Sequence, residues 1–268
     1  MMRFPLRLTV DLALARLAQT SRENAARTSV LLLAPMEPAS PSGLDSSALH
    51  PMAPRAGTEL LARVRNASAP VVWIGGSEPL LHPEMGQLTR CIAGTGRDVF
   101  LETDGALLRR RIHEFRPVSR LFLTIQWNGL ERSHDVRAGR AGAFQAALEG
   151  MRVARLSGFL ICVHALFHAE TALGEMAESI HFARSLDVDG IVISSANGGS
   201  NSANPEATDL QQKIVEARKL IGSKWWESFS RLVGPLVSGQ RNTTPGAEAV
   251  GVRAERESHA NEESVRVA

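Results

Sequence analysis

The sequence predicts an α/β fold: a partial, open TIM-type barrel of about six parallel strands with helices outside. Short apolar runs recur at residues 29–33, 71–74, 98–101, 121–125, 159–163 and 191–193. Nearly continuous apolar runs are typical of parallel strands that are covered on both faces. Amphipathic helical patterns lie between them, most clearly at 144–154 and 173–183. Six units are fewer than the eight of a closed barrel, so we expect an open one.

The 268-residue chain divides into four predicted regions. They are an N-terminal amphipathic helix (1–27), the partial barrel (28–222), a C-terminal extension (223–245) and a disordered tail (246–268). In the first helix we expect partial burial of Val10, Leu12, Leu14, Leu17 and Ala18. The tail is polar and charged without aromatic residues, which is typical of disorder. Residues 35–57 are rich in Pro, Ser, Gly and Ala and predict a long loop after the first strand.

Composition and charge exclude several classes of function. The formal net charge is +2, with 30 basic and 28 acidic residues, so no cationic face for nucleic acid is indicated. The two cysteines, Cys91 and Cys162, form no CxxC pair, so neither a cysteine-rich zinc site nor a disulfide framework is expected. Asp11 and Arg16 interrupt the N-terminal apolar segment, which argues against a secretory signal. We expect a cytoplasmic protein with at most peripheral membrane contact through its first helix.

Polar side chains follow the predicted strands. Where parallel strands end, loops and helix starts converge, and ligand sites are built there. These residues are Gly75, Gly76, Ser77, Glu78 and Pro79, then Glu102, Thr103 and Asp104, then Gln126, Asn128, His134 and Asp135, and finally Cys162, His164 and Ser194. Each has a purely structural alternative: Gly75 and Gly76 a tight turn, Glu78 a helix cap, His134-Asp135 a surface loop pair, His164 a hydrogen-bonded core residue. A metal site made from Glu78, Glu102, Cys162 and His164 is a further alternative.

Several of these segments, taken in order, resemble radical S-adenosylmethionine (SAM) enzymes. Residues 71–84, VVWIGGSEPLLHPE, resemble the Gly-Gly-Glu-Pro segment of that superfamily, with Ser77 at the second glycine. Thr103-Asp104-Gly105 resembles its Thr-Asn-Gly, and residues 128–135 resemble its Asp-Gly…His-Asp segment. Within the superfamily the sequence is most similar to the hopanoid-biosynthesis adenosylhopene transferase family, colinearly from about residue 5 to about residue 245.

The resemblance implies SAM as a ligand and places it at the strand ends. Backbone atoms of residues 76–79 would contact the SAM amino group, and the ends of the fourth to sixth strands would hold its ribose, carboxylate and adenine. The residues that the resemblance assigns to SAM are Gly76, Ser77, Glu78, Pro79, Thr103, Asp104, Gln126, Asn128, Arg140, His164 and Ser194.

One departure from the family concerns its chemistry. Radical SAM enzymes hold a four-iron cluster on three cysteines spaced CxxxCxxC after the first strand. An ungapped alignment puts Ala39, Gly43 and Ser46 at those positions, and none supplies the thiolate that iron–sulfur clusters require. Ser77 for Gly, Asp104 for Asn and Asn128 for Asp depart from the family pattern as well. The ligands of the four-iron cluster are therefore absent, and SAM, if it binds, is expected to bind weakly.

These observations predict a divergent radical-SAM-like protein that has lost its cluster. We expect a non-catalytic relative that binds a small-molecule or lipid ligand or a protein partner, linked to hopanoid or lipid metabolism by the resemblance. The alternative is a SAM-dependent enzyme that transfers an adenosyl group to a hopene-like lipid by other means. No catalytic or metal-binding residue is assigned.

Overall fold

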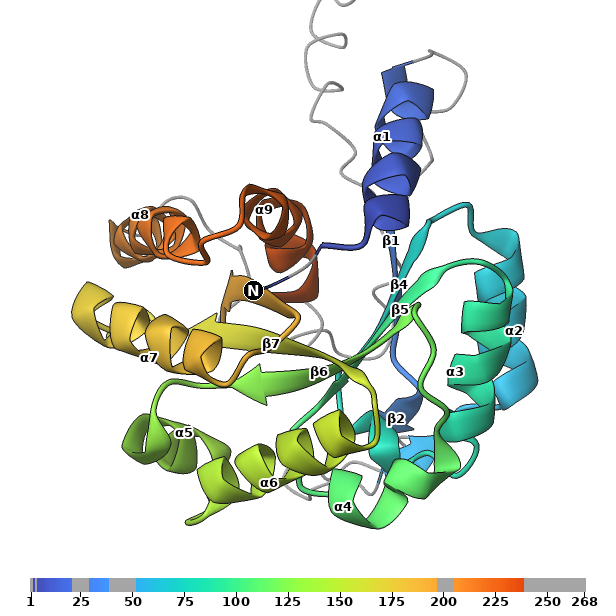
Figure 1. Ribbon diagram of the computed structural model, residues 1–268, viewed down its shortest axis with the longest axis horizontal. Coiled ribbons are helices and arrows are strands. Elements are labelled where there is room, and N and C mark those ends of the chain that lie inside the picture. Colours follow the sequence, from blue (N-terminus) through green and yellow to red (C-terminus); the bar gives the residue numbers. More distant parts are fainter. Residues whose placement is uncertain (1, 3, 21–28, 39–51, 197–204, 239–268) are drawn as a thin grey trace, which may run out of the picture.

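A curled sheet of six parallel strands forms the centre of the protein (Figure 1). The computed structural model describes residues 2, 4–20, 29–38, 52–196 and 205–238. The strands lie side by side in the order β1-β4-β5-β6-β7-β8, and every neighbouring pair is parallel. This arrangement confirms the predicted open, partial TIM-type barrel.

The strands follow the predicted apolar runs and extend beyond some of them. They are β1 (Val30–Leu33), β4 (Val71–Ile74), β5 (Asp98–Thr103), β6 (Leu121–Trp127), β7 (Leu160–Phe167) and β8 (Gly190–Ser195). Nearly all of their side chains are buried, as expected for a parallel sheet that is covered on both faces. The last four strands continue for two or more residues past the predicted ends, and the added residues include the polar Glu102, Gln126, His164 and Ser194.

Helices α2 (Gly57–Asn66), α3 (Met85–Gly94), α6 (Ala143–Leu156) and α7 (Leu173–Ser185) cover the outer face of the sheet (Figure 1). Shorter elements lie between them: α4 (Leu108–Arg111), α5 (Glu131–Ala138) and the 3-10 turns η1 (Pro79–Leu81) and η2 (Ile112–Glu114). In α6 the residues Phe144, Ala147, Leu148, Met151 and Ala154 are buried, as the helical pattern predicts. Gly158 then reverses the chain with φ +83°, a value that favours glycine.

The C-terminal helices cover the inner face and the free edge of β8. They are α8 (Pro205–Lys219) and α9 (Lys224–Ser238), and α9 packs along β8. The Ser230 hydroxyl accepts a hydrogen bond from the backbone N–H of Ile193, which satisfies a group at the sheet edge. Trp226 and Phe229 contact Phe100, and Trp226 also contacts Phe122. Aromatic side chains therefore fill the space between α9 and the inner face of β5 and β6.

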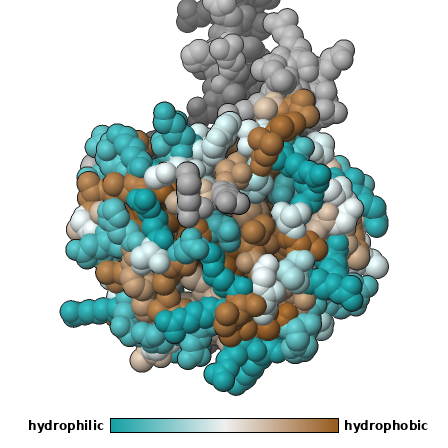
Figure 2. Space-filling model, in the orientation of Figure 1, coloured by the Kyte–Doolittle hydropathy of each residue, from teal (hydrophilic) through white to brown (hydrophobic). Residues whose placement is uncertain are grey.

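Two features of the N-terminal half differ from the predictions. The stretch 35–57 is not loop throughout, because β2 (Met36–Pro38) and β3 (Met52–Pro54) pair as an antiparallel ribbon and α2 begins at Gly57. Helix α1 (Leu6–Thr20) buries Leu8, whereas Val10 and Leu14 are 51% and 58% exposed, so their predicted burial is wrong. Apolar atoms are visible along α1 in Figure 2.

Other predictions fall outside the described part of the chain. The side chains of Leu17 and Ala18, the aligned positions Ala39, Gly43 and Ser46, residues 239–245 and the predicted tail 246–268 all lie there. Among the described residues, none of the helices has the length and apolar character needed to cross a bilayer.

Candidate ligand site at the strand ends

The loops after β4 and β5 are joined by one buried carboxylate. Glu78 Oε1 accepts a hydrogen bond from the backbone N–H of Leu80, and its Oε2 accepts one from that of Asp104, both at 2.9 Å. The first bond caps η1, which agrees with the structural alternative for this residue. The second fixes the Thr103-Asp104-Gly105 turn against the Gly76-Ser77 turn. The two segments that carry the resemblance thus form one unit.

Burial changes the charge of Glu78. The pKa of its carboxyl is raised to about 7, mainly by removal from water and also by the neighbouring Asp104 carboxylate, although the backbone hydrogen bonds from Asp104 and Leu80 oppose the rise. Near neutral pH the group is consequently divided between its neutral and charged forms. A cationic ligand placed nearby would favour the carboxylate and displace the proton.

A pair of opposite charges lies at the rim of this unit. Arg140 Nη2 is 3.8 Å from Asp104 Oδ2, and the two side chains are 53% and 46% exposed. Asp104 Oδ1 also accepts a hydrogen bond from the backbone N–H of Ala106, which holds the carboxylate in place. Separated charges of this kind can meet the ammonium and carboxylate groups of an amino-acid ligand.

The backbone of the Gly76-Ser77 turn is open on one side. Gly76 has φ +91°, and a side chain at that position would meet only Ala34 Cβ, at 3.6 Å. The Ser77 hydroxyl instead lies 3.8 Å from Met52 Sδ of β3. The β2–β3 ribbon therefore contacts the turn that the resemblance assigns to SAM.

Inside the barrel, four strands contribute a connected row of polar groups. The Trp73 indole N–H donates to Glu102 Oε2 at 3.0 Å, and Glu102 Oε1 lies 2.8 Å from His164 Nδ1. His164 Nε2 is 2.5 Å from Ser194 Oγ. All four side chains are buried. Both ring nitrogens of His164 are therefore engaged within the protein, so any effect of His164 on a ligand would pass through Ser194.

Two further polar groups face the same interior without a partner. Within the described residues, Thr124 Oγ1 and Gln126 Nε2 are buried and make no hydrogen bond. Thr124 pairs in register with Glu102 and Cys162, and Gln126 with His164, so they share the inner face. Buried unpaired polar groups are uncommon and call for an explanation such as a bound ligand or water.

Other predicted site residues have structural roles. His134 and Asp135 lie on α5, not in a surface loop, and His134 is buried. Burial lowers the pKa of His134, and its Nδ1 accepts a hydrogen bond from the backbone N–H of Asn128. Asp135 accepts hydrogen bonds from the backbone N–H groups of Gly142 and Phe144, which lowers the pKa of its carboxyl and fixes the start of α6. Asn128 contacts His134 and Arg137 through its backbone N–H and carbonyl groups.

The metal-site alternative fails in this structure. Among the described residues, which include Glu78, Glu102, Cys162 and His164, no three His, Cys, Asp or Glu side chains are grouped so that they could hold a metal ion. Burial raises the pKa of the Cys162 thiol well above its usual range, so a thiolate is disfavoured there.

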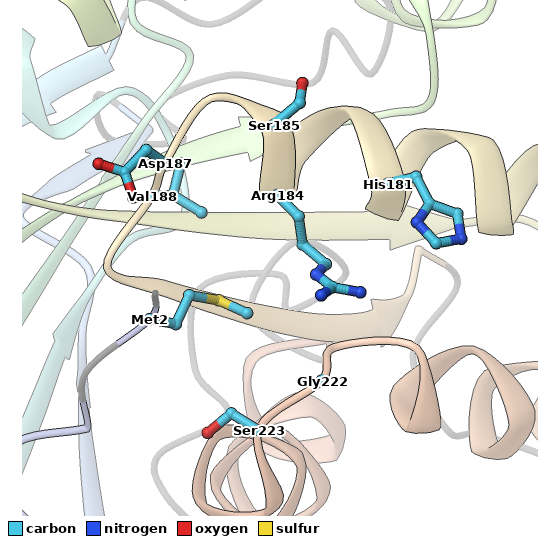
Figure 3. Close-up of a pocket in the computed structure, with 8 residues that line it drawn as sticks. All are labelled: Met2, His181, Arg184, Ser185, Asp187, Val188, Gly222 and Ser223. Carbon is cyan, nitrogen blue, oxygen red and sulfur yellow. The ribbon is translucent and has the colours of Figure 1, made fainter.

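A hollow of about 630 Å³ lies away from these strand ends, between the C-terminal part of α7 and the start of α9 (Figure 3). Its walls include Arg184, Val188 and Ser223, and Val188 precedes β8. It is thus near the amino ends of the strands. The polar strand ends and this hollow are separate features of the molecule.

The fold is an open, partial TIM-type barrel whose strand-end segments resemble those of radical SAM enzymes, and comparisons with known proteins support a relation to that superfamily. Over 99 residues the chain is 33% identical to the AdoMet-dependent heme synthase of Methanosarcina barkeri, covering 36% of this chain and 28% of that protein. It is 24% identical over 106 residues to the Fe-coproporphyrin III synthase of the same organism, covering 39% of this chain and 27% of that protein. The matches thus span less than a third of either curated relative. No family model matches the chain.

Solved structures show the same fold at low sequence identity. SuiB of Streptococcus suis bound to S-adenosylmethionine superimposes with a TM-score of 0.51 at 10% identity, over 73% of this chain and 46% of that one. SuiB bound to its precursor peptide SuiA gives 0.50 at 9% identity, over 82% and 53%. These likenesses support the architecture alone.

Proposed function

We propose that this protein is a radical-SAM-type barrel without an iron–sulfur cluster, acting as a ligand- or partner-binding relative and not as a radical enzyme. The observation that carries the proposal is the cysteine content. The sequence has two cysteines, whereas the family's cluster requires three in one loop. Cys91 lies on the outer helix α3 and is exposed, and Cys162 is buried in β7. The residues present do not fit the cluster.

The residues at the strand ends, in contrast, fit part of SAM. The exposed charges of Asp104 and Arg140 suit its ammonium and carboxylate groups, and the open Gly76-Ser77 turn offers backbone atoms nearby. In cluster-containing relatives the open iron also takes the SAM amino and carboxylate groups. Here those bonds are lacking, so SAM or a related amino-acid ligand is proposed to bind weakly.

The proposed link to hopanoid or other lipid metabolism follows from the family resemblance of the sequence. One observation favours the alternative, a SAM-dependent enzyme that works by other means. The interior keeps Glu102, His164 and Ser194 together with the unpaired Gln126, and a polar interior of this kind is costly to keep without a use.

Anaerobic reconstitution with iron and sulfide tests the proposal directly. We expect no four-iron cluster by iron count and absorbance, before and after replacement of Cys91 or Cys162 by serine. About four irons per chain, lost on either replacement, would contradict it. A cluster-containing relative treated in parallel serves as the positive control.

A further inference from the structure

The buried row of Glu102, His164 and Ser194 has the order of groups found at nucleophilic serines. A hydroxyl lies beside one imidazole nitrogen, and a carboxylate lies beside the other. We propose that Ser194 is a nucleophile activated by His164 as general base and oriented by Glu102, and that it reacts with small carboxylic esters. This inference goes beyond the proposed function and does not depend on SAM or on a cluster.

The geometry fixes the role of each nitrogen of the imidazole. The Glu102 carboxylate, 2.8 Å from Nδ1, favours the tautomer in which Nδ1–H donates to it. The Nε2 lone pair is then left to accept the Ser194 hydroxyl proton across 2.5 Å. Trp73 donates to the other carboxylate oxygen at 3.0 Å, so the carboxylate is itself held in place. The imidazole is consequently oriented toward the Ser194 hydroxyl, and the Glu102 carboxylate holds it in that orientation.

The strand register explains why these three residues meet. Glu102 on β5 pairs with Thr124 on β6, which pairs with Cys162 on β7, and His164 is two residues further along the same face. Ser194 is two residues beyond Val192, the partner of His164 on β8. A parallel sheet places alternate residues on one face, so all of these side chains point into the barrel. The strands hold the row without a flexible loop.

An independent observation points to a reacting ligand. The Gln126 amide nitrogen is buried, has no partner among the described residues, and belongs to the strand position that pairs with His164. A nucleophile that attacks a carbonyl needs a donor for the oxygen that becomes negative. An unpaired amide N–H on the inner face supplies such a donor, and the neighbouring Thr124 hydroxyl, also unpaired, supplies a second.

The chemistry balances without a cofactor. Ser194 Oγ forms a bond to the ester carbonyl carbon while its proton passes to His164 Nε2. The carbon–oxygen bond to the alcohol then breaks, and the alcohol leaves with the proton from His164. Water repeats the sequence on the acyl-serine, which releases the carboxylic acid and restores Ser194. Glu102 remains ionised throughout and stabilises the imidazolium.

The packing limits the size of the substrate. The Ser194 side chain is 1% exposed, and the inner face below it is filled by aromatic residues that include Trp73 and Phe100. Ser194 is nevertheless the last residue but one of β8, at the end of the barrel where ligands of this fold class enter. A compact acyl group such as acetyl fits these limits better than a long chain.

The test uses a small dialkyl fluorophosphate, which phosphorylates activated serines: the serine oxygen bonds to phosphorus and fluoride leaves. The full chain is treated, digested, and mapped by mass spectrometry. We expect modification at Ser194, absent in urea-unfolded protein and slowed about 100-fold or more by His164→Asn and by Glu102→Gln. Ser195→Ala, which alters the neighbouring serine on the opposite face, should leave the modification unchanged.

Two outcomes would overturn the proposal. One is wild-type protein that stays unmodified at Ser194 under conditions that fully modify a known serine hydrolase. The other is modification of Ser194 at the same rate in folded His164→Asn protein. Circular dichroism of each variant shows whether it is folded, and the wild-type mapping alone decides the question should a variant fail to fold.

Discussion

Glu78 and Asp104 lie 26 residues apart in the sequence, yet the Glu78 carboxylate accepts the Asp104 backbone N–H at 2.9 Å. This bond joins the turns after β4 and β5 and gives the strand-end site a fixed shape. The Glu78 side chain is accordingly engaged with the backbone, which leaves the carboxylate of Asp104 and the guanidinium of Arg140 as the exposed charges beside it.

Replacing Glu78 by glutamine should therefore loosen the site. One oxygen acceptor becomes an NH₂ group, so one of the two backbone N–H groups is left unpaired. We expect a loss of about 1–2 kcal/mol in the free energy of unfolding, measured in urea at pH 5, where the Glu78 carboxyl of the folded wild type, with its pKa raised to about 7, is also mostly neutral. Glu149→Gln on the exposed surface of α6 is the matched control and should change stability by less than about 0.5 kcal/mol. Equal stability of the two variants would show that the bond contributes nothing.

The sequence predicts the strands of this fold well because each is a buried apolar run. It underestimates their length where polar residues continue the strand into the barrel. Gln126 on β6 and His164 on β7 were expected to mark strand ends that contact a ligand. Both lie inside the strand ladder, and His164 is engaged on both ring nitrogens. A polar residue in an apolar run does not reveal whether its partner is a ligand or another strand.

Contacts between distant segments likewise cannot be predicted from the sequence pattern. Alternating apolar residues in α1 suggest several possible buried faces, and only the packing against the barrel selects Leu8 over Val10. The β2–β3 ribbon has short strands with proline in each, a composition that indicates a loop. In both cases tertiary packing outweighs the local pattern.

The buried carboxyl of Asp98 should make stability depend on pH. Removal from water raises its pKa to about 6, although Arg120 at 3.2 Å opposes the shift. A folded-state pKa above the unfolded value of about 3.8 means that the folded protein binds the proton more tightly. The stability gained in this way is fully present below about pH 4 and is lost as the pH rises through 6.

Comparison with Asp98→Asn isolates this effect. The difference in unfolding free energy, wild type minus variant, should fall by about 2 kcal/mol between pH 4 and pH 7. Urea titrations across that range measure it. The exposed Asp209→Asn variant in α8 should show no comparable fall. A difference that rises with pH would mean that the Arg120 ion pair dominates the environment of Asp98.

Close packing of α9 on β8 can be tested at Gly190. A methyl group there would lie 2.3 Å from ring atoms of Trp226, which is too close for any real contact. Gly190→Ala should cost about 3 kcal/mol and displace α9, with a change in tryptophan fluorescence. Gly174→Ala in α7 adds the same methyl group where nothing lies within 4 Å, so it should be neutral or slightly stabilising. Equal stability of the two variants would contradict the packing of Trp226 described above.

Calorimetry with SAM tests the strand-end site itself. Without an iron to take the amino and carboxylate groups, two or three hydrogen bonds and modest burial remain, at about 1 kcal/mol net for each bond. We expect a dissociation constant near the millimolar range, equivalent to about 4 kcal/mol. Arg140→Ala and Asp104→Asn should weaken binding further, whereas Arg152→Ala on the exposed face of α6 should not.

The protons released on binding provide a second readout. The raised pKa of Glu78, about 7, leaves part of its carboxyl neutral at neutral pH, and the cationic groups of SAM would favour the charged form. Binding at pH 7 should thus release a fraction of a proton, so the measured heat should change with the ionisation enthalpy of the buffer, and Glu78→Gln should abolish that change. A micromolar constant that weakens on changing Glu78 would support the enzyme alternative. No heat at millimolar SAM would instead favour a protein partner or a different ligand.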